Sequence, residues 1–287
     1  MVLAMRRIPL RFLALGAAIA AASTVGLAQA AASPAAHHGP AQVQPLDHFL
    51  CYTTVATSAS TGFKPVKGTR LVNQFTPNGI VPVIGKKAVL HCNPAFKYIN
   101  GRLVSEPANP ESHLLCLPLS KVPEQPTFTV HVTNQFGAGN LVATQPTRFC
   151  LPTWKSLTGP PVEPTPDPPN LYHFTCYPVT YAAGSTKFKP PGKVSVSDEF
   201  DPAGAAPVPV TIGGPKLLCL PTTKILPSGQ SYPADLQGLH LLCFTVSKTP
   251  VISPVYDLNQ FGESAVGIEA TKYLCLPSEK TVISSTG

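Results

Sequence analysis

Hydrophobic and polar side chains alternate residue by residue in several short stretches of this chain. In residues 126–136, PTFTVHVTNQF, the side chains of Phe128, Val130 and Val132 fall on one face and polar side chains fall on the other. Residues 192–200, GKVSVSDEF, and residues 265–270, AVGIEA, show the same alternation. A period of two is typical of half-buried antiparallel strands. The pattern therefore predicts an all-β fold.

The high proline content is compatible with an all-β fold and indicates that its strands are short. The chain holds 34 prolines among 287 residues, more than twice the usual ~5%. Proline removes a backbone donor and clashes with the preceding helical turn, so long helices are excluded. We expect short strands joined by turns rich in proline and glycine.

A motif of the form His-x-x-Cys occurs four times, and each copy opens a similar segment. A triplet that ends in phenylalanine follows each copy, and a Cys-x-Pro-x-x-Lys motif closes each segment. The histidines are His48, His113, His173 and His240; the first cysteines are Cys51, Cys116, Cys176 and Cys243; the triplets end at Phe75, Phe136, Phe200 and Phe261; the closing cysteines are Cys92, Cys150, Cys219 and Cys275. We name these segments units 1 to 4, each about 60 residues long.

Long and short units alternate, and only units 1 and 3 contain the sequence FKP. Duplication of one unit, followed by duplication of the resulting pair, explains this alternation. We therefore expect two tandem disulfide-stapled domains, each a β-sandwich or barrel-like fold of two units. The first is predicted at residues 46–158 and the second at 171–282. A proline-rich linker, 159–170, separates them, and residues 283–287 form a tail.

The first 30 residues read as a signal peptide. Arg6, Arg7 and Arg11 precede an apolar run, and small residues stand at Ala28 and Ala30. Residues 31–45 read as a disordered lead-in. We expect a secreted protein, extracellular or associated with the periplasm or cell surface, with no membrane span in the mature chain. The sequence does not distinguish Sec from twin-arginine export.

The eight cysteines are expected to form disulfides, because paired cysteines persist outside the cytoplasm. One bridge per unit is the simplest pairing, joining the first cysteine of each unit to its closing cysteine. Each such bridge contributes on the order of 4 kcal/mol in the chain-entropy model. Four cysteines in a doublet allow three pairings, and the rival to the simplest one joins Cys51 to Cys150.

The repeated histidines are interpreted as scaffold residues and not as metal ligands. On a strand, residues three apart face opposite sides of the sheet, so the histidine and cysteine of one motif cannot bind one ion. The triplets read as strand ends with phenylalanine inward and carboxamides closing a turn. In unit 3 the acidic residues Asp198, Glu199 and Asp201 are expected to form a solvated turn, with a weak Ca²⁺ site as the alternative. Four lysines are expected at the surface: Lys97, Lys155, Lys224 and Lys280.

Charge and motifs exclude several functions. The chain carries 21 basic and 14 acidic residues, three of the basic ones in the leader, and lacks the dense basic footprint of nucleic-acid binding. No G-x-S-x-G, H-E-x-x-H, P-loop or dinucleotide motif occurs. We therefore predict no catalytic, cofactor or metal residues. The expected protein is non-catalytic and acts in binding, adhesion or envelope structure on an unknown extracellular ligand. The alternatives are a hydrolase with its site in loops 97–113 or 224–240, and a metal-sequestering protein.

The motif order resembles a family of secreted bacterial repeat domains of unknown function. Their repeat reads D-H-F-x-C-Y, then D-Q-F-G, then L-C-x-P-x-x-K. DHFLCY at 47–52, NQFG at 134 and 259, and the four closing motifs match it. Unit 3 departs most, and unit 1 lacks glycine after NQF. The resemblance implies a secreted repeat fold and no particular activity.

Overall fold

The computed structural model describes residues 45–57, 63–247 and 254–286. These residues contain nineteen strands and no helix. The strands are β1 (Phe49–Ala56), β2 (Arg70–Asn73), β3 (Thr76–Ile80), β4 (Val83–Ile84), β5 (Leu90–Pro94), β6 (Phe96–Ile99), β7 (Arg102–Ser105), β8 (His113–Ser120), β9 (Thr127–Asn134), β10 (Gly137–Ala143), β11 (Arg148–Ser156), β12 (His173–Tyr181), β13 (Val194–Ser197), β14 (Val208–Val210), β15 (Ile212–Ile225), β16 (Ser231–Tyr232), β17 (His240–Val246), β18 (Val255–Asn259) and β19 (Gly262–Thr286).

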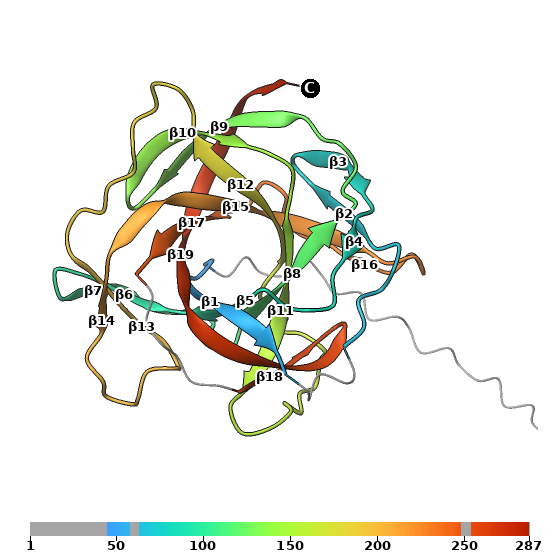
Figure 1. Ribbon diagram of the computed structural model, residues 1–287, viewed down its shortest axis with the longest axis horizontal. Coiled ribbons are helices and arrows are strands. Elements are labelled where there is room, and N and C mark those ends of the chain that lie inside the picture. The colour runs from blue at the N-terminus through green and yellow to red at the C-terminus, as the bar shows by residue number, and fades with distance from the viewer. Residues whose placement is uncertain (1–44, 58–62, 248–253, 287) are drawn as a thin grey trace, which may run out of the picture. The chain divides into compact units, whose positions relative to one another are not determined.

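Eight of these strands form a closed antiparallel ring. Its order is β1, β5, β8, β11, β12, β15, β17 and β19, and β19 pairs with β1 to close it. In Figure 1 these strands surround a common centre. Each unit contributes two strands to the ring, one beginning near its histidine and one carrying its closing cysteine. Closure leaves no ring strand with an unpaired edge.

The two faces of the ring strands carry different hydrophobic clusters. On β1, Phe49 and Cys51 belong to an inner cluster that contains all eight cysteines, whereas Leu50 and Tyr52 belong to an outer cluster. Both clusters are buried because further strands cover the outer face. The ring strands are therefore nearly continuous hydrophobic runs around their cysteines, whereas burial alternates along covering strands such as β9 and β13.

The covering strands end in turns made by the triplets. The side-chain Oδ1 of Asn73, Asn134, Asp198 and Asn259 accepts a hydrogen bond from the backbone N–H two residues later, at 2.8–2.9 Å. This is the Asx turn that short polar side chains favour. It directs the third residue of the triplet inward: Phe75, Phe136 and Phe261 are buried, and Phe200 is half-buried. The predicted role of the triplets is confirmed.

The structure does not show the two tandem domains that the sequence predicts. In the large sheet, strands of residues 46–158 pair with strands of residues 171–282 six times. The pairs are β11–β12 and β1–β19 in the ring, and β2–β15, β9–β19, β10–β12 and β11–β18 outside it. A separate small sheet, β14-β13-β6-β7, also mixes the two halves. The physical reason is that two ring strands per unit leave edges exposed in any half, and the halves satisfy these edges by pairing with each other.

The predicted leader, linker and tail segments are described by the structure only in part. The signal peptide lies outside the described residues, as does all but the last residue of the lead-in at 31–45. The linker at 159–170 packs back on the fold, since Trp154 Nε1 donates to the carbonyl of Thr165 at 2.8 Å. Residues 283–286 continue β19 instead of forming a tail. Within the described part of the chain we find no helix that could cross a bilayer.

Candidate functional site

The four disulfides lie inside the ring. Each joins the two cysteines of one unit, and in every case these cysteines are directly opposite each other on neighbouring antiparallel strands: Cys51–Cys92, Cys116–Cys150, Cys176–Cys219 and Cys243–Cys275. The rival Cys51–Cys150 bridge is absent. No free cysteine occurs among the described residues.

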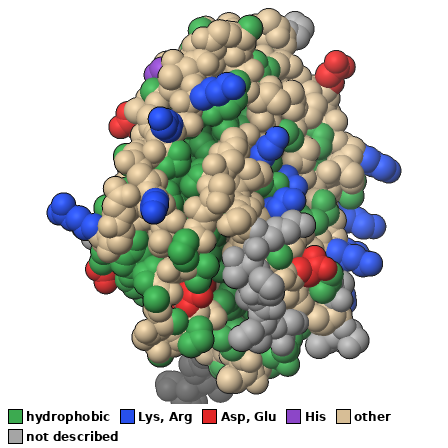
Figure 2. All heavy atoms as spheres, turned by 60° about the vertical axis from the view of Figure 1, so that its left-hand side comes forward, with side chains coloured by type: hydrophobic (Ala, Val, Ile, Leu, Met, Phe, Trp, Pro, Cys, Tyr) green, Lys and Arg blue, Asp and Glu red, His purple; other side chains and the backbone are tan. Residues whose placement is uncertain are grey.

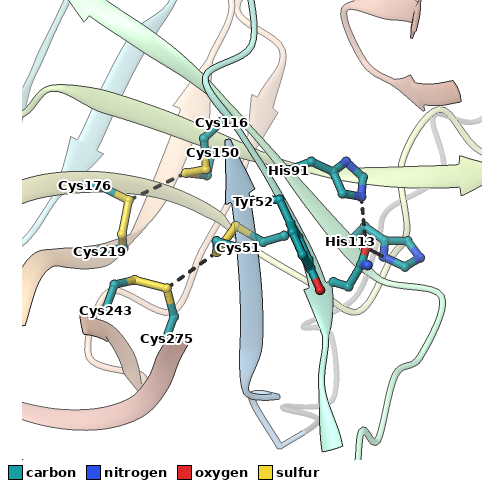
Figure 3. The surroundings of a disulfide bond; sticks show 12 residues. Cys51, Tyr52, His91, His113, Cys116, Cys150, Cys176, Cys219, Cys243 and Cys275 are labelled. Atoms are coloured by element: carbon teal, nitrogen blue, oxygen red, sulfur yellow. Dashed lines mark hydrogen bonds between the residues drawn. A yellow bond between two sulfur atoms is a disulfide. The ribbon is translucent and has the colours of Figure 1, made fainter. Parts of the chain in front are cut away.

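The disulfides also contact one another. The Sγ atoms of Cys51 and Cys275 lie 3.6 Å apart, as do those of Cys150 and Cys176. Figure 3 shows the four bridges gathered on one side of the ring strands, with Tyr52, His91 and His113 on the other. The sulfur atoms fill the ring so well that only a cavity of about 10 Å³ remains among them. The centre of the ring is a packed core and not a channel.

The four repeated histidines lie on the outer face, opposite the cysteines, and are all buried. Each lies near the lysine that closes its own unit, and each lysine meets the triplet of the next unit. We call these groups stations. Station 1 is Lys97, His48, Gln135 and Phe136; station 2 is Lys155, His113, Glu199 and Phe200; station 3 is Lys224, His173, Gln260 and Phe261; station 4 is Lys280, His240, Gln74 and Phe75.

The prediction that these lysines lie at the surface is wrong. Lys97 and Lys224 are 0% exposed. At station 1, Lys97 Nζ donates to His48 Nε2 at 2.8 Å and to Gln135 Oε1, and lies 5.4 Å from the centre of the Phe136 ring. The ammonium group is thus held by a ring face and two acceptors, which offset its burial.

Burial shifts the pKa values of the station residues. Loss of solvation lowers the pKa of Lys97 to about 8 and that of Lys280 to about 8. It lowers the pKa of His48 and of His240 to about 3, with the neighbouring lysine acting in the same direction. Both imidazoles are therefore neutral near pH 7. His48 Nε2 accepts the hydrogen bond from Lys97, whereas neither ring nitrogen of His240 has a hydrogen-bond partner among the described residues.

Station 3 differs in its hydrogen bonding. Lys224 Nζ has no hydrogen-bond acceptor and lies over the rings of Tyr232, at 4.2 Å, and Phe261, at 5.0 Å. Loss of solvation lowers the pKa of Lys224 to about 7, although the nearby Asp167 acts to raise it. Gln260 Nε2 donates to Asp167 at 2.7 Å instead of meeting the lysine.

Station 2 differs more strongly, because the units depart from their common pattern around it. The residue before the closing cysteine is His91 in unit 1 but a buried Phe or Leu in the other units, and the residue after it is Asn93 but otherwise Leu. The triplet of unit 3 begins Asp198-Glu199 in place of Asn-Gln. Two residues before the triplet of unit 4 stands Asp257, where the other units have buried Leu or Val.

These departures come together in one buried group. We name it the polar cluster: Tyr52, His91, Asn93, His113, Lys155, Asp198, Glu199 and Asp257. Unit 1 provides three of its residues, units 2 and 3 provide two each, and unit 4 provides one. Most of these polar groups hydrogen-bond to one another, which offsets the cost of about 2–7 kcal/mol that an isolated buried polar group carries. Asp257 lies 3.2 Å from His91 without a hydrogen bond.

Asn93 lies at the centre of the polar cluster. Its Oδ1 is 3.0 Å from His91 Nε2, 3.1 Å from His113 Nδ1 and 3.3 Å from Lys155 Nζ. Its Nδ2 donates to Asp198 Oδ2 at 3.0 Å. Behind His91, the Nδ1 atom lies 3.2 Å from Asp257 Oδ1, and both side chains are fully buried.

Asp198 is not in the solvated turn that the sequence predicts. It is buried and accepts hydrogen bonds from the Tyr52 hydroxyl at 2.8 Å and from Asn93. Burial raises the pKa of Asp198, while hydrogen bonds from the Phe200 amide, Tyr52 and Asn93 act to lower it. The net upward shift favours the protonated acid. Of the three acidic residues, only Glu199 points to the cluster edge that is open to solvent.

One group of possible metal ligands borders the polar cluster. Ligand atoms of Glu111, His113 and Glu199 lie within 4.8 Å of one another. The Lys155 ammonium contacts the same Glu199 carboxylate, so a positive charge already occupies the position that a cation would need. Loss of solvation, reinforced by Lys155, lowers the pKa of His113 well below its usual range. The arrangement therefore favours an internal ion pair over a metal ion.

A separate cavity of about 90 Å³ lies at the starts of β1 and β12. Its apolar lining includes Leu46, Phe49, Leu171, Phe174 and Leu239, and the two loops considered for a hydrolase, 97–113 and 224–240, both contribute to its rim. Its opening offers space for one small ring or branched aliphatic group.

Sequence reasoning found the cysteines, histidines and phenylalanines but missed the polar cluster and the lysine stations. The signal was available in the aligned units. Three positions are buried and hydrophobic in all units but one. The exceptions are His91 and Asn93 in unit 1 and Asp257 in unit 4. Reading the exceptions to the repeat, and not only the repeat itself, would have identified the cluster.

Comparison with known proteins adds no relative: no family model, no curated protein and no solved structure matches this chain. The resemblance to secreted repeat domains rests on the motifs alone.

Proposed function

We propose that the protein is exported and acts without catalytic turnover, as a rigid binding, adhesion or envelope protein. The observation that carries this proposal is that the repeated residues serve the fold itself. The cysteines fill the ring, the phenylalanines pack inward, and each histidine is buried near the lysine of its own unit, with a hydrogen bond between the two at station 1. Such a fold keeps its surface in a fixed arrangement, which lowers the ordering cost of binding.

Export is supported by the chemistry of the cysteines. Four disulfides without a free thiol in the described residues fit an oxidising compartment, and the expected signal peptide agrees. In this proposal the four units descend from one unit of about 60 residues, duplicated twice. The mature protein recovered from the periplasm or medium should contain no alkylatable thiol. Recovery from the cytoplasm with eight free thiols would refute export.

The face in Figure 2 supports binding through apolar or mixed contacts and not through nucleic acid. Its Lys and Arg side chains stand singly, separated by hydrophobic and uncharged groups, and form no continuous basic stripe. Phosphate backbones select clustered positive charge. The partner class that we propose is an extracellular or envelope ligand that presents a small apolar group to the cavity at β1 and β12.

The cavity can be tested with small probes. We expect phenol or cyclohexanol to bind saturably and to shift the NMR signals of residues at the cavity. Leu239, 42% exposed at the rim, contributes apolar contact, so Leu239→Gln should weaken binding by about threefold or more. Leu103 is 43% exposed and does not line the cavity, so Leu103→Gln is the matched control. Signal shifts without saturation, or equal effects of both variants, would refute the cavity as the binding site.

A hydrolase remains the second candidate because both inter-unit loops contribute to the rim of this cavity. A panel of ester, glycoside and peptide substrates tests it directly. Turnover that Leu239→Gln reduces and Leu103→Gln leaves unchanged would favour the hydrolase over the binding protein. Metal sequestration is tested by intact-mass measurement of the native protein, and we expect no bound ion at Glu111, His113 and Glu199, because Lys155 contacts Glu199.

A further inference from the structure

The side-chain amide of Asn93 is surrounded by every group that an acyl transfer needs. An amine, Lys155 Nζ, lies 3.3 Å from Oδ1. Two imidazole nitrogens approach the same oxygen at 3.0 and 3.1 Å. A carboxyl group, Asp198, accepts a hydrogen bond from the amide nitrogen at 3.0 Å. Water has little access, since Asn93 is 0% exposed and the Lys155 side chain 2%.

We propose that Lys155 and Asn93 join in an intramolecular isopeptide bond, with release of ammonia. The reaction is a single self-modification of the folded chain and requires no turnover. It is independent of the ligand that the protein binds.

The step balances without a further reactant. The Glu199 carboxylate, which contacts Lys155 Nζ, takes one proton from the ammonium group. The amine so formed makes the Nζ–Cγ bond, the Cγ–Nδ2 bond breaks, and Nδ2 leaves as ammonia. Asp198 supplies the proton that the leaving nitrogen takes, and the second proton that Nζ loses returns to the Asp198 carboxylate. Nothing is oxidised or reduced.

The two histidines stabilise the oxygen on which negative charge develops. His91 Nε2 and His113 Nδ1 both point at Asn93 Oδ1, so two N–H groups can donate to it as the tetrahedral intermediate forms. Donors fixed in advance in a site that excludes water are an effective source of rate enhancement. Asp257 lies against the far nitrogen of His91 and orients this ring, so Asp257 is a positioning residue.

Asp198 is suited to act as the acid. Burial raises the pKa of its carboxyl group, which favours the protonated form needed to donate to Nδ2. Tyr52 fixes its orientation through the 2.8 Å hydrogen bond. The fold also holds the amine against the amide, so the reaction is intramolecular. Effective concentrations of reacting groups held in this way reach about 10⁵ M or more.

The other stations lack this arrangement. The position of Asn93 is occupied by buried leucines in units 2 to 4, at Leu151, Leu220 and Leu276, and none of these offers an electrophile. The proposed bond thus explains why unit 1 has Asn93 at a position where the other three units have leucine. The bond would tie β5 to β11 across β8, which lies between them in the ring.

Intact-mass measurement of the oxidised mature protein is the decisive experiment. Four disulfides lower the mass by about 8 Da, and we expect a further deficit of about 17 Da from the lost ammonia. After reduction, alkylation and trypsin digestion, residues 88–97 should be found joined to residues 149–187, with no cleavage after Lys155. A mass without the further deficit, together with separate recovery of peptides 88–97, 149–155 and 156–187, overturns the proposal.

Two variants test the chemistry. Asn93→Asp should give a crosslinked product of the same mass as the wild-type protein, because loss of water from Asp and loss of ammonia from Asn yield the same bond. Asp198→Asn should abolish the deficit while the four disulfides, mapped in the same digest, report that the chain has folded. Lys280→Met, the equivalent change in unit 4, should leave the deficit intact. A deficit that persists in a Lys155→Met variant would also overturn the proposal.

Discussion

Replacement of Lys97 by methionine tests whether burial of the station lysines controls the pH dependence of stability. Lys97 is fully buried, and loss of solvation lowers its pKa from 10.5 to about 8. Methionine keeps an unbranched side chain, one atom shorter than that of lysine, and removes the charge. It also removes the hydrogen bonds to His48 and Gln135, a loss that should depend little on pH above 7 because His48 is already neutral there.

The sign follows from proton counting. Between pH 8 and 10.5 the unfolded chain keeps the Lys97 proton and the folded protein releases it, so the wild-type free energy of unfolding rises with pH. Below pH 8 the full destabilising effect of the low pKa is present. A difference of about 2.5 pKa units corresponds to about 3 kcal/mol. The stability of the wild type relative to Lys97→Met should therefore increase by about 2–3 kcal/mol from pH 7 to pH 10.

Urea denaturation of both proteins at several pH values, followed by far-UV circular dichroism, measures this difference. Lys67→Met, at an exposed position, is the control and should show no comparable trend. If the difference between wild type and Lys97→Met is constant from pH 7 to pH 10, Lys97 is not held at a lowered pKa and the reasoning fails.

Two further substitutions test the ring and the polar cluster. The double variant Cys116→Ser/Cys150→Ser should lose on the order of 4 kcal/mol of unfolding free energy, because the bridge closes a loop between residues 34 apart; a loss below about 1 kcal/mol in urea denaturation would contradict this. Tyr52→Phe removes the hydrogen bond to the buried Asp198 and should cost about 1–2 kcal/mol. Tyr177→Phe, the equivalent change in unit 3, removes hydrogen bonds to Asn73 and should cost a similar amount in the same thermal or urea assay.

Local patterns were sufficient for some parts of this structure. Alternation over residues 126–136 predicted a strand, and β9 covers Thr127–Asn134. The predicted Asx turn of the triplets depends only on a short polar side chain and the backbone two residues later, so it forms wherever the triplet occurs. Opposite faces for His48 and Cys51 follow from the period of two.

Burial of the lysines could not be read from the same patterns. The sequence Cys-x-Pro-x-x-Lys places Lys97 just after a ring strand, which is compatible with the surface or the interior. The groups that hold it, Gln135 and Phe136, belong to another unit. Whether a charged side chain is buried depends on partners that only the folded chain brings to it.

The sequence by itself determined that this protein is built of strands, which residues of each strand share a face, and which turns end the covering strands. The expectation that all strands are short is wrong for β15 and β19, which have 14 and 25 residues. The tertiary structure decided that all four units share one ring, that β1 meets β19, and that residues from three units surround Asn93. The physical reason is that side-chain alternation specifies the two faces of a strand but not its neighbour. Backbone groups at the two edges can pair with any strand of suitable length, and closure of the whole ring selects the one arrangement that leaves none unpaired.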